Sequence, residues 1–135
     1  RFGHHRFKSL QFKSKIIKLD LHKAFLGFSK WDPNVNSDVN DLPIATGSWG
    51  CGAFLGNKSL KFLIQYMAAA QNDREIRYYA YGDKQFVTAV NQFLNKLPAN
   101  ITIGEVKRLI HEFKVEDAEH TYELFDFILK NNTAV

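Results

Sequence analysis

Apolar residues recur with a helical period along most of the chain and gather into short runs in two places. Between Leu10 and Phe28 the apolar residues fit a helical repeat better than strict alternation, and Gly27 lies near the end of this segment. We therefore expect a helix here, with an apolar stripe formed by Ile16, Ile17, Leu19, Leu21, Ala24, Phe25 and Phe28. Asn, Asp, Ser and two prolines follow in residues 31–43, which predicts an exposed loop.

Two short segments have strand character and flank a strongly apolar helix. Leu42–Thr46 is a brief apolar run that ends at Gly47, and Ile76–Tyr81 (IRYYAY) is rich in residues that favour strands. Between them, apolar residues recur at helical spacing after Asn57 or Ser59, either of which can cap the helix. This helix is apolar nearly all round, so it is predicted to be buried. Two strands joined through a helix form a βαβ unit, and its strands pair in parallel through a right-handed crossover.

Only helical patterns follow the second strand. Asp83 can cap a helix that ends at Pro98, and residues 102–105 (TIGE) predict a capping box in which Glu105 reaches back to the cap. A last helix is lined by Tyr122, Phe125, Ile128 and Leu129. The predicted sheet therefore has two strands, which is small for an α/β domain and leaves exposed edges. Either the missing strands belong to sequence outside this chain, or a partner covers the edges.

The composition of the 135 residues suits one domain with a hydrophobic core, because 45% are hydrophobic and 14% aromatic. Cys51 is the single cysteine and no histidines lie at metal-ligand spacing, so neither a disulfide nor a metal or other cofactor is predicted. No apolar run approaches the roughly 20 residues that cross a bilayer. We expect no membrane association and a cytoplasmic or nuclear location. The chain begins with Arg1 rather than Met, which we interpret as a processed chain or a piece of a longer one.

The net charge of +4 is unevenly distributed. Residues 1–30 contain eight Lys or Arg and a single acid, Asp20, so this segment carries +7 and the remainder −3. A basic segment suggests an anionic partner, such as a phosphate polymer, a nucleic acid or an acidic protein tail. The alternative is charge that is simply solvated on one face of a helix.

The loop between the first strand and the apolar helix carries the clearest indication of function. Residues 44–58 (IATGSWGCGAFLGNK) contain the four glycines Gly47, Gly50, Gly52 and Gly56. A strand, a glycine-rich turn and a helix N-terminus together favour phosphate binding, because several amides point one way and the helix dipole adds positive charge. The loop is not a P-loop, since Gly56 is followed by Asn57 rather than Lys. The last three glycines have one residue too many for a dinucleotide fingerprint, although Asp83 could mimic its ribose-binding acid, so a Rossmann interpretation and a turn that binds nothing both stay open.

Three stretches together carry a family resemblance. ATGSWGCGAFLGN, LKFLIQYMAAAQ and IRYYAYGD resemble the C-terminal part of the catalytic macrodomain of the poly(ADP-ribose) glycohydrolases, and LHKAFLGF (21–28) is similar to the helix that precedes this strand in that family. The resemblance is dense from Leu21 to Asp83. It implies an α/β fold, the C-terminal half of a macrodomain. In this single partial domain, 1–135, a basic helical segment (1–30) precedes the βαβ unit with its phosphate loop (42–83), and several helices follow (84–135).

The resemblance also implies an ADP-ribose site. The residues that match the family loop wrapping the ADP-ribose diphosphate with main-chain amides are Gly47, Gly50, Cys51, Gly52, Ala53 and Phe54. Tyr81 takes the place of an aromatic residue that lies against the adenosine part of the ligand. Ser48 stands where the family usually has Asn, near the adenine and ribose, and its shorter side chain can keep one hydrogen bond. Trp49 and Phe54 are expected to pack beneath the loop, and Cys51 to be a small buried residue rather than a nucleophile.

Catalysis in this family is carried by a glycine-rich loop followed by Gln-Glu-Glu, in which one Glu acts as general acid and base. No such string occurs in the 135 residues, so we predict no catalytic residue and no activity for this chain alone. One hypothesis is a fragment of a glycosidase of poly(ADP-ribose) that binds the ADP-ribose diphosphate, with its catalytic loop elsewhere. The other is a catalytically dead relative that acts as a structural or interaction protein in a large assembly. Expected partners are ADP-ribose or poly(ADP-ribose), the missing half of the domain, or an acidic protein that contacts residues 1–30.

Overall fold

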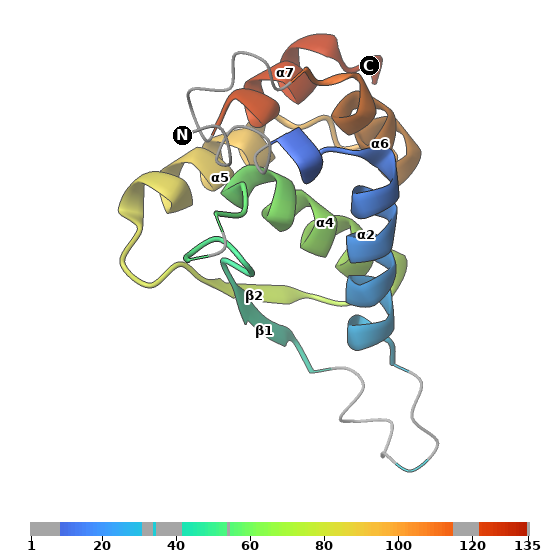
Figure 1. Ribbon diagram of the computed structural model, residues 1–135, viewed down its shortest axis with the longest axis vertical. Coiled ribbons are helices and arrows are strands. Elements are labelled where there is room, and N and C mark those ends of the chain that lie inside the picture. Colours follow the sequence, from blue (N-terminus) through green and yellow to red (C-terminus); the bar gives the residue numbers. More distant parts are fainter. Residues whose placement is uncertain (1–8, 31–33, 35–41, 54, 115–121, 135) are drawn as a thin grey trace.

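A computed structural model describes residues 9–30, 34, 42–53, 55–114 and 122–134. Figure 1 shows the elements of these residues, which run in the order α2 (Ser14–Phe28), β1 (Ile44–Gly47), α4 (Lys58–Gln71), β2 (Ile76–Tyr79), α5 (Lys84–Lys96), α6 (Ile103–Glu112) and α7 (Glu123–Asn131). Most of the predicted loop 31–43 lies outside the described residues. In the described part of the chain, no helix combines the length and the apolar character needed to span a bilayer.

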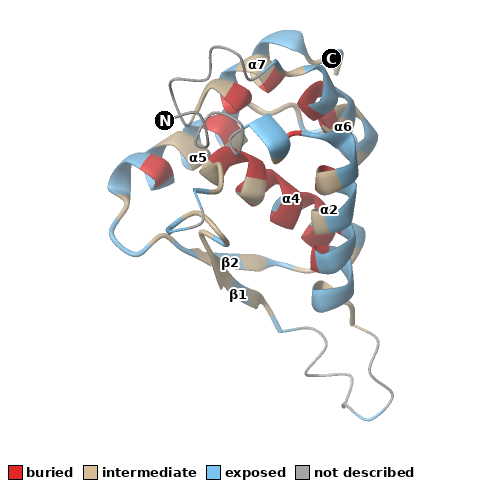
Figure 2. Cartoon of the chain, in the orientation of Figure 1, coloured by how far each residue is buried: buried red, intermediate tan, exposed pale blue. Residues whose placement is uncertain are grey.

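Helix α4 is the centre of the hydrophobic core. Nine of its 14 residues are buried, as predicted for a helix that is apolar nearly all round, and Figure 2 shows buried residues concentrated along it. Asn57 is its cap, because the Asn57 side chain accepts a hydrogen bond from the amide of Leu60 at 2.9 Å. The ring of Phe62 contacts Tyr78 of β2 and Phe125 of α7, with ring centroids 5.6 and 6.0 Å apart. In Figure 1 the two strands lie on one side of α4, and α6 and α7 lie on the other.

The two strands pair in parallel, which confirms the predicted βαβ unit. Ile44 lies opposite Ile76 and Gly47 opposite Tyr79, and α4 forms the crossover. The predicted end of the second strand at Tyr81 is wrong by two residues. Tyr81 and Gly82 have φ angles of +49° and +83°, so the backbone turns in the left-handed region and cannot continue the strand.

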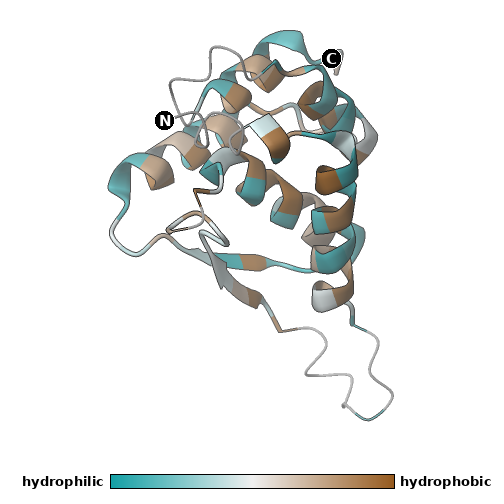
Figure 3. Ribbon diagram, in the orientation of Figure 1, coloured by the Kyte–Doolittle hydropathy of each residue, from teal (hydrophilic) through white to brown (hydrophobic). Residues whose placement is uncertain are grey.

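Helix α2 packs along α4 through a narrower apolar face than the sequence suggested. Ile17, Leu21 and Ala24 are buried, whereas Leu19 of the predicted stripe is 49% exposed. Hydrophobic and hydrophilic colours alternate along α2 in Figure 3, as expected of an amphipathic helix. Lys61 of α4 donates a hydrogen bond to the Asp20 carboxylate and so ties the two helices together. The lysines of α2 at positions 15, 18 and 23 are exposed, and whether they meet an anionic partner stays a prediction.

The C-terminal helices close the far side of the core, largely through aromatic rings. Asp83 caps α5 as predicted, since its carboxylate accepts from the Phe86 amide at 3.1 Å. Phe93 of α5 stacks on Phe125 of α7 with ring centroids 4.4 Å apart, and both residues are buried. Stacked and edge-on rings of this kind add stabilisation beyond the apolar area that they bury.

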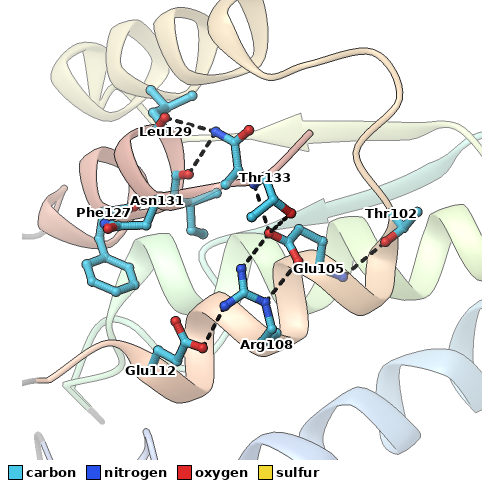
Figure 4. A network of polar contacts seen from close by, with 10 residues as sticks. Thr102, Glu105, Arg108, Glu112, Phe127, Leu129, Asn131 and Thr133 are labelled. Carbon is cyan, nitrogen blue, oxygen red and sulfur yellow. Dashed lines mark hydrogen bonds and ion pairs between the residues drawn. The ribbon is translucent and has the colours of Figure 1, made fainter. Parts of the chain in front are cut away.

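The start of α6 forms only one of the two hydrogen bonds of the predicted capping box. Thr102 Oγ1 accepts from the Glu105 amide at 3.1 Å, as expected, but the Glu105 carboxylate turns to Arg108 and to the amide of Thr133 instead of the cap (Figure 4). A charged partner on the next turn and an amide in the segment after α7 attract the carboxylate more than one cap amide does. Arg108 and the Thr133 amide lower the pKa of Glu105 to about 2.

Candidate functional site

A hollow of about 630 Å³ lies where the two parallel strands end. Its lining residues are Ala45, Thr46, Gly47, Ser48, Trp49, Tyr79 and Tyr81. Of the residues predicted to hold ADP-ribose, the hollow therefore brings Gly47, Ser48 and Tyr81 together. Sequence reasoning missed Thr46 and Tyr79, although the carboxyl ends of parallel strands are where ligands of α/β sheets commonly bind.

The glycine loop beside this hollow closes on itself. The Gly56 amide donates to the Gly50 carbonyl at 2.9 Å, and the Leu55 amide donates to the Gly52 carbonyl at 3.0 Å. Gly50 has a φ of +69°, in the left-handed region where a side chain is strained. A Cβ atom on Gly56 would lie 2.6 Å from the Gly50 carbonyl oxygen, so the closure requires glycine there.

Replacing Gly56 by alanine is expected to destabilise the protein. The new methyl group would meet backbone that cannot move aside without opening the loop, so we expect the free energy of unfolding to fall by about 1–3 kcal/mol. Chemical denaturation followed by circular dichroism measures this loss. The matched control is Gly52→Ala, because a Cβ at Gly52 meets no atom within 4 Å. Equal stabilities of the two variants would contradict the role given to Gly56.

Several amides of the loop are available to a ligand. The Cys51 amide is used within the loop, since it donates to the Ser48 carbonyl at 3.1 Å, and the Asn57 amide donates to Gln11 at 2.7 Å. The amides of residues 50, 52 and 53 have no hydrogen-bond partner among the described residues. Residues 52 and 53 are also exposed. Phe54, the remaining predicted residue of the loop, lies outside the described residues.

The aromatic anchor of the loop is Tyr78 rather than Trp49. Trp49 was expected beneath the loop, but it is 42% exposed, lines the hollow and has Lys61 Nζ 5.7 Å from its ring centroid. Tyr78 packs its ring against Phe62 in the core and reaches the loop through its hydroxyl, 2.9 Å from Ser48 Oγ. Burial raises the pKa of Tyr78, so the hydroxyl stays protonated at neutral pH. The Ser48 hydroxyl is thus committed to Tyr78 in this structure.

The chemistry of Cys51 agrees with a structural role. Burial raises the pKa of its thiol, an effect larger than the opposing pull of Lys61 and Lys58. Its Sγ lies 3.3 Å from the Trp49 carbonyl oxygen, to which it donates a hydrogen bond. A protonated thiol is a poor nucleophile, which supports the interpretation that Cys51 is not a nucleophile. Cys51 is only partly buried, however, and not fully buried as the sequence suggested.

Lys58 and Asp83 join the end of the glycine loop to the turn that carries Tyr81. Lys58 Nζ donates to one carboxylate oxygen of Asp83, and the other oxygen accepts from the Phe86 amide. The hydrogen bond from Lys58 lowers the pKa of Asp83. Each carboxylate oxygen of Asp83 thus has a partner within the chain, which explains the residue as a helix cap and an ion-pair partner and gives no support to the Rossmann interpretation.

Comparison with known proteins gives the family of the chain. The family model described as "Poly (ADP-ribose) glycohydrolase (PARG), Macro domain fold" matches residues 1–88. The chain belongs to the poly(ADP-ribose) glycohydrolase family. It is 31% identical over 117 residues to poly(ADP-ribose) glycohydrolase 1 of Caenorhabditis elegans, an alignment covering 86% of this chain and 14% of the relative. It is 50% identical over 84 residues to poly(ADP-ribose) glycohydrolase 1 of Arabidopsis thaliana, covering 60% of this chain and 15% of the relative.

The predicted resemblance to the C-terminal catalytic part of the poly(ADP-ribose) glycohydrolases is thereby confirmed, together with the coarse α/β fold. The match to the family model ends early in α5, so most of α5 and all of α6 and α7 lie beyond it. The chain spans about a fifth or less of the length of the curated relatives named here and of poly(ADP-ribose) glycohydrolase 2 of Caenorhabditis elegans.

The carboxylates of the described residues lie away from the hollow. In the part of the chain that the structure describes, no Asp or Glu lines the hollow. Glu75 pairs with Arg77, while Glu105 and Glu112 both pair with Arg108. The same described residues contain no group of three or more His, Cys, Asp or Glu that could hold a metal ion.

Proposed function

We propose that the chain is the ADP-ribose-binding, C-terminal half of a poly(ADP-ribose) glycohydrolase macrodomain, with its catalytic glutamate on sequence outside these 135 residues. In this proposal the diphosphate lies on the glycine loop and the adenosine part lies against Tyr81. The observation that carries it is the combination of a hollow at the strand ends with loop amides that have no partner among the described residues.

Charge at the loop favours a diphosphate. The amides of Gly52 and Ala53 are close in sequence to the N-terminus of α4, where the helix dipole adds partial positive charge. Lys58 and Lys61 lie on the first turn of the same helix and add two cations, each already paired with one carboxylate. Amides that converge near a helix N-terminus bind phosphate oxygens more strongly than they bind neutral acceptors.

The exposure of Tyr81 favours contact with a nucleoside. The Tyr81 side chain is 92% exposed beside the hollow, and its backbone has a φ of +49°. A left-handed conformation at a bulky residue is uncommon and costs free energy, which makes such positions candidates for function. An exposed aromatic ring can stack on a base without any rearrangement of the core.

Replacing Tyr81 by alanine is expected to weaken ADP-ribose binding. Loss of a stacking ring costs about 1–3 kcal/mol, which corresponds to a rise in Kd of about 5-fold to 150-fold. Isothermal titration calorimetry with ADP-ribose measures this change. The control, Tyr81→Phe, keeps the ring and is expected to bind like the parent. No binding by the parent chain would contradict the proposed function, and equal affinities of the alanine variant and the parent would remove Tyr81 from the site.

A further inference from the structure

Gln65 is a buried amide in the middle of the hydrophobic core. It is 1% exposed, and the residues around it on α4, among them Leu63, Ile64 and Met67, are also buried. Burying a side-chain amide costs free energy unless its donors and acceptors find partners. Gln65 therefore has to be explained by what it binds.

Both partners of Gln65 lie at the end of β1, directly before the glycine loop. Gln65 Nε2 donates to the Gly47 carbonyl at 3.1 Å, and Gln65 Oε1 accepts from the Thr46 hydroxyl. The Gly47 carbonyl also accepts from the Trp49 amide at 2.8 Å, which is a hydrogen bond within the loop itself. The Gly47 carbonyl thus accepts one hydrogen bond from a core side chain, Gln65, and one from a loop amide, that of Trp49.

The two strands are so close at Gly47 that the end of β1 has little room to shift. A Cβ atom on Gly47 would lie 3.0 Å from the Tyr79 carbonyl oxygen, because the two strands approach closely there. Thr46, Gly47 and Tyr79 all line the hollow, whereas Gln65 does not. A side chain that holds Thr46 and Gly47 in place therefore fixes part of the lining of the hollow, although it does not contact a ligand bound there.

We infer that Gln65 is a positioning residue of the proposed ADP-ribose site, which fixes the point at which β1 ends and the glycine loop departs. The inference rests on the proposed function for its link to ADP-ribose. The fixed loop geometry itself does not depend on a ligand. Preorganised amides bind an anion better than amides that must be ordered on binding, so a loosened loop is expected to lose affinity.

The double variant Thr46→Val, Gln65→Met separates positioning from plain stability. Gln65→Met alone leaves the Thr46 hydroxyl without its partner, which destabilises the fold. Adding Thr46→Val removes that hydroxyl, and the Gly47 carbonyl keeps its bond from Trp49. We expect the double variant to fold with nearly parental stability, although the end of β1 is no longer hydrogen-bonded to the side chain at position 65 of α4.

Two measurements test the inference on the whole chain. Hydrogen exchange without ligand is expected to be about tenfold faster at the Trp49, Cys51 and Gly56 amides, and unchanged at amides of α6. The ADP-ribose Kd from calorimetry is expected to rise about tenfold relative to Thr46→Val alone, the comparison that accounts for any contact Thr46 itself makes in the hollow; this is the loss for one hydrogen bond near the top of its usual range. Gln71→Met is the matched control, because Gln71 is an exposed glutamine of the same helix, and it should change neither measurement.

Each outcome decides the inference. Unchanged loop exchange in the double variant overturns it, and so does an equal acceleration in the loop and in α6, which indicates a purely structural role. Faster loop exchange with an unchanged Kd also overturns it. If the parent chain binds no ADP-ribose, the proposed function fails, and loop exchange alone then decides whether Gln65 positions the loop.

Discussion

Valine at position 52 is expected to abolish ADP-ribose binding while leaving the fold intact. A Cβ on Gly52 meets no protein atom within 4 Å, so the loop has room for the first carbon of a new side chain, and a branched valine adds bulk next to the backbone amides of residues 52 and 53. If these amides hold the diphosphate, two hydrogen bonds to a charged group are lost. At about 1.5–3 kcal/mol each, the Kd is expected to rise on the order of 100-fold or more. Charge does not change, so the effect isolates geometry.

Calorimetry and thermal unfolding of the parent and two variants decide this prediction. Gly27→Val is the matched control, because a Cβ at Gly27 also meets no atom within 4 Å and Gly27 lies in α2, away from the loop. Both variants are expected to unfold at nearly the parental temperature. If Gly52→Val binds ADP-ribose like the parent, the diphosphate does not lie on these amides, and the glycine loop serves only as a turn.

Those parts of the fold that depend on neighbouring residues could be predicted from the sequence. The caps at Asn57, Asp83 and Thr102 each require one side chain and an amide three residues later, so a short motif is sufficient. The parallel pair also follows from local information, because a helix between two strands almost forces the crossover.

Details that depend on distant contacts could not be predicted. The Glu105 carboxylate binds Thr133, which is 28 residues away, and no local pattern reports that contact. The end of β2 depends on the left-handed backbone at Tyr81, a conformation that the sequence YAYGD does not require of tyrosine. Trp49 was expected to pack beneath the loop, but the core side of the loop is reached by Tyr78, which the sequence placed only in a strand.

Only part of the candidate site could be predicted, because some of its residues come together through contacts between distant parts of the sequence. Gly47, Ser48 and Tyr81 came from the family motif, and the structure brings them to one hollow. Thr46 and Tyr79 belong to it through strand pairing, which places the carboxyl ends of both strands side by side. Gln65 was seen only as one residue of the buried helix, since its role arises from a contact across 18 residues.

The chain alone is expected to release no ADP-ribose from poly(ADP-ribose) above background. Glycoside cleavage needs a carboxyl group at the scissile bond to protonate the leaving oxygen and to activate water. Within the described residues, no carboxylate lines the hollow, and Asp83, which follows the turn carrying Tyr81, is occupied by Lys58 and by its own helix. Bound polymer would therefore meet loop amides and aromatic rings but no general acid. The expected result is binding without turnover.

Release of ADP-ribose from purified polymer, followed over time, measures this directly. Enzymes commonly turn over at about 1–1000 per second, so even a weak activity would stand far above the uncatalysed rate. Poly(ADP-ribose) glycohydrolase 1 of Arabidopsis thaliana, run in parallel, shows that the polymer is a competent substrate. Turnover by the chain on the order of 1 per second would contradict the prediction. In that case Asp83→Asn and Glu75→Gln would test whether either carboxylate supplies the missing acid, since loss of turnover in one variant alone would identify it.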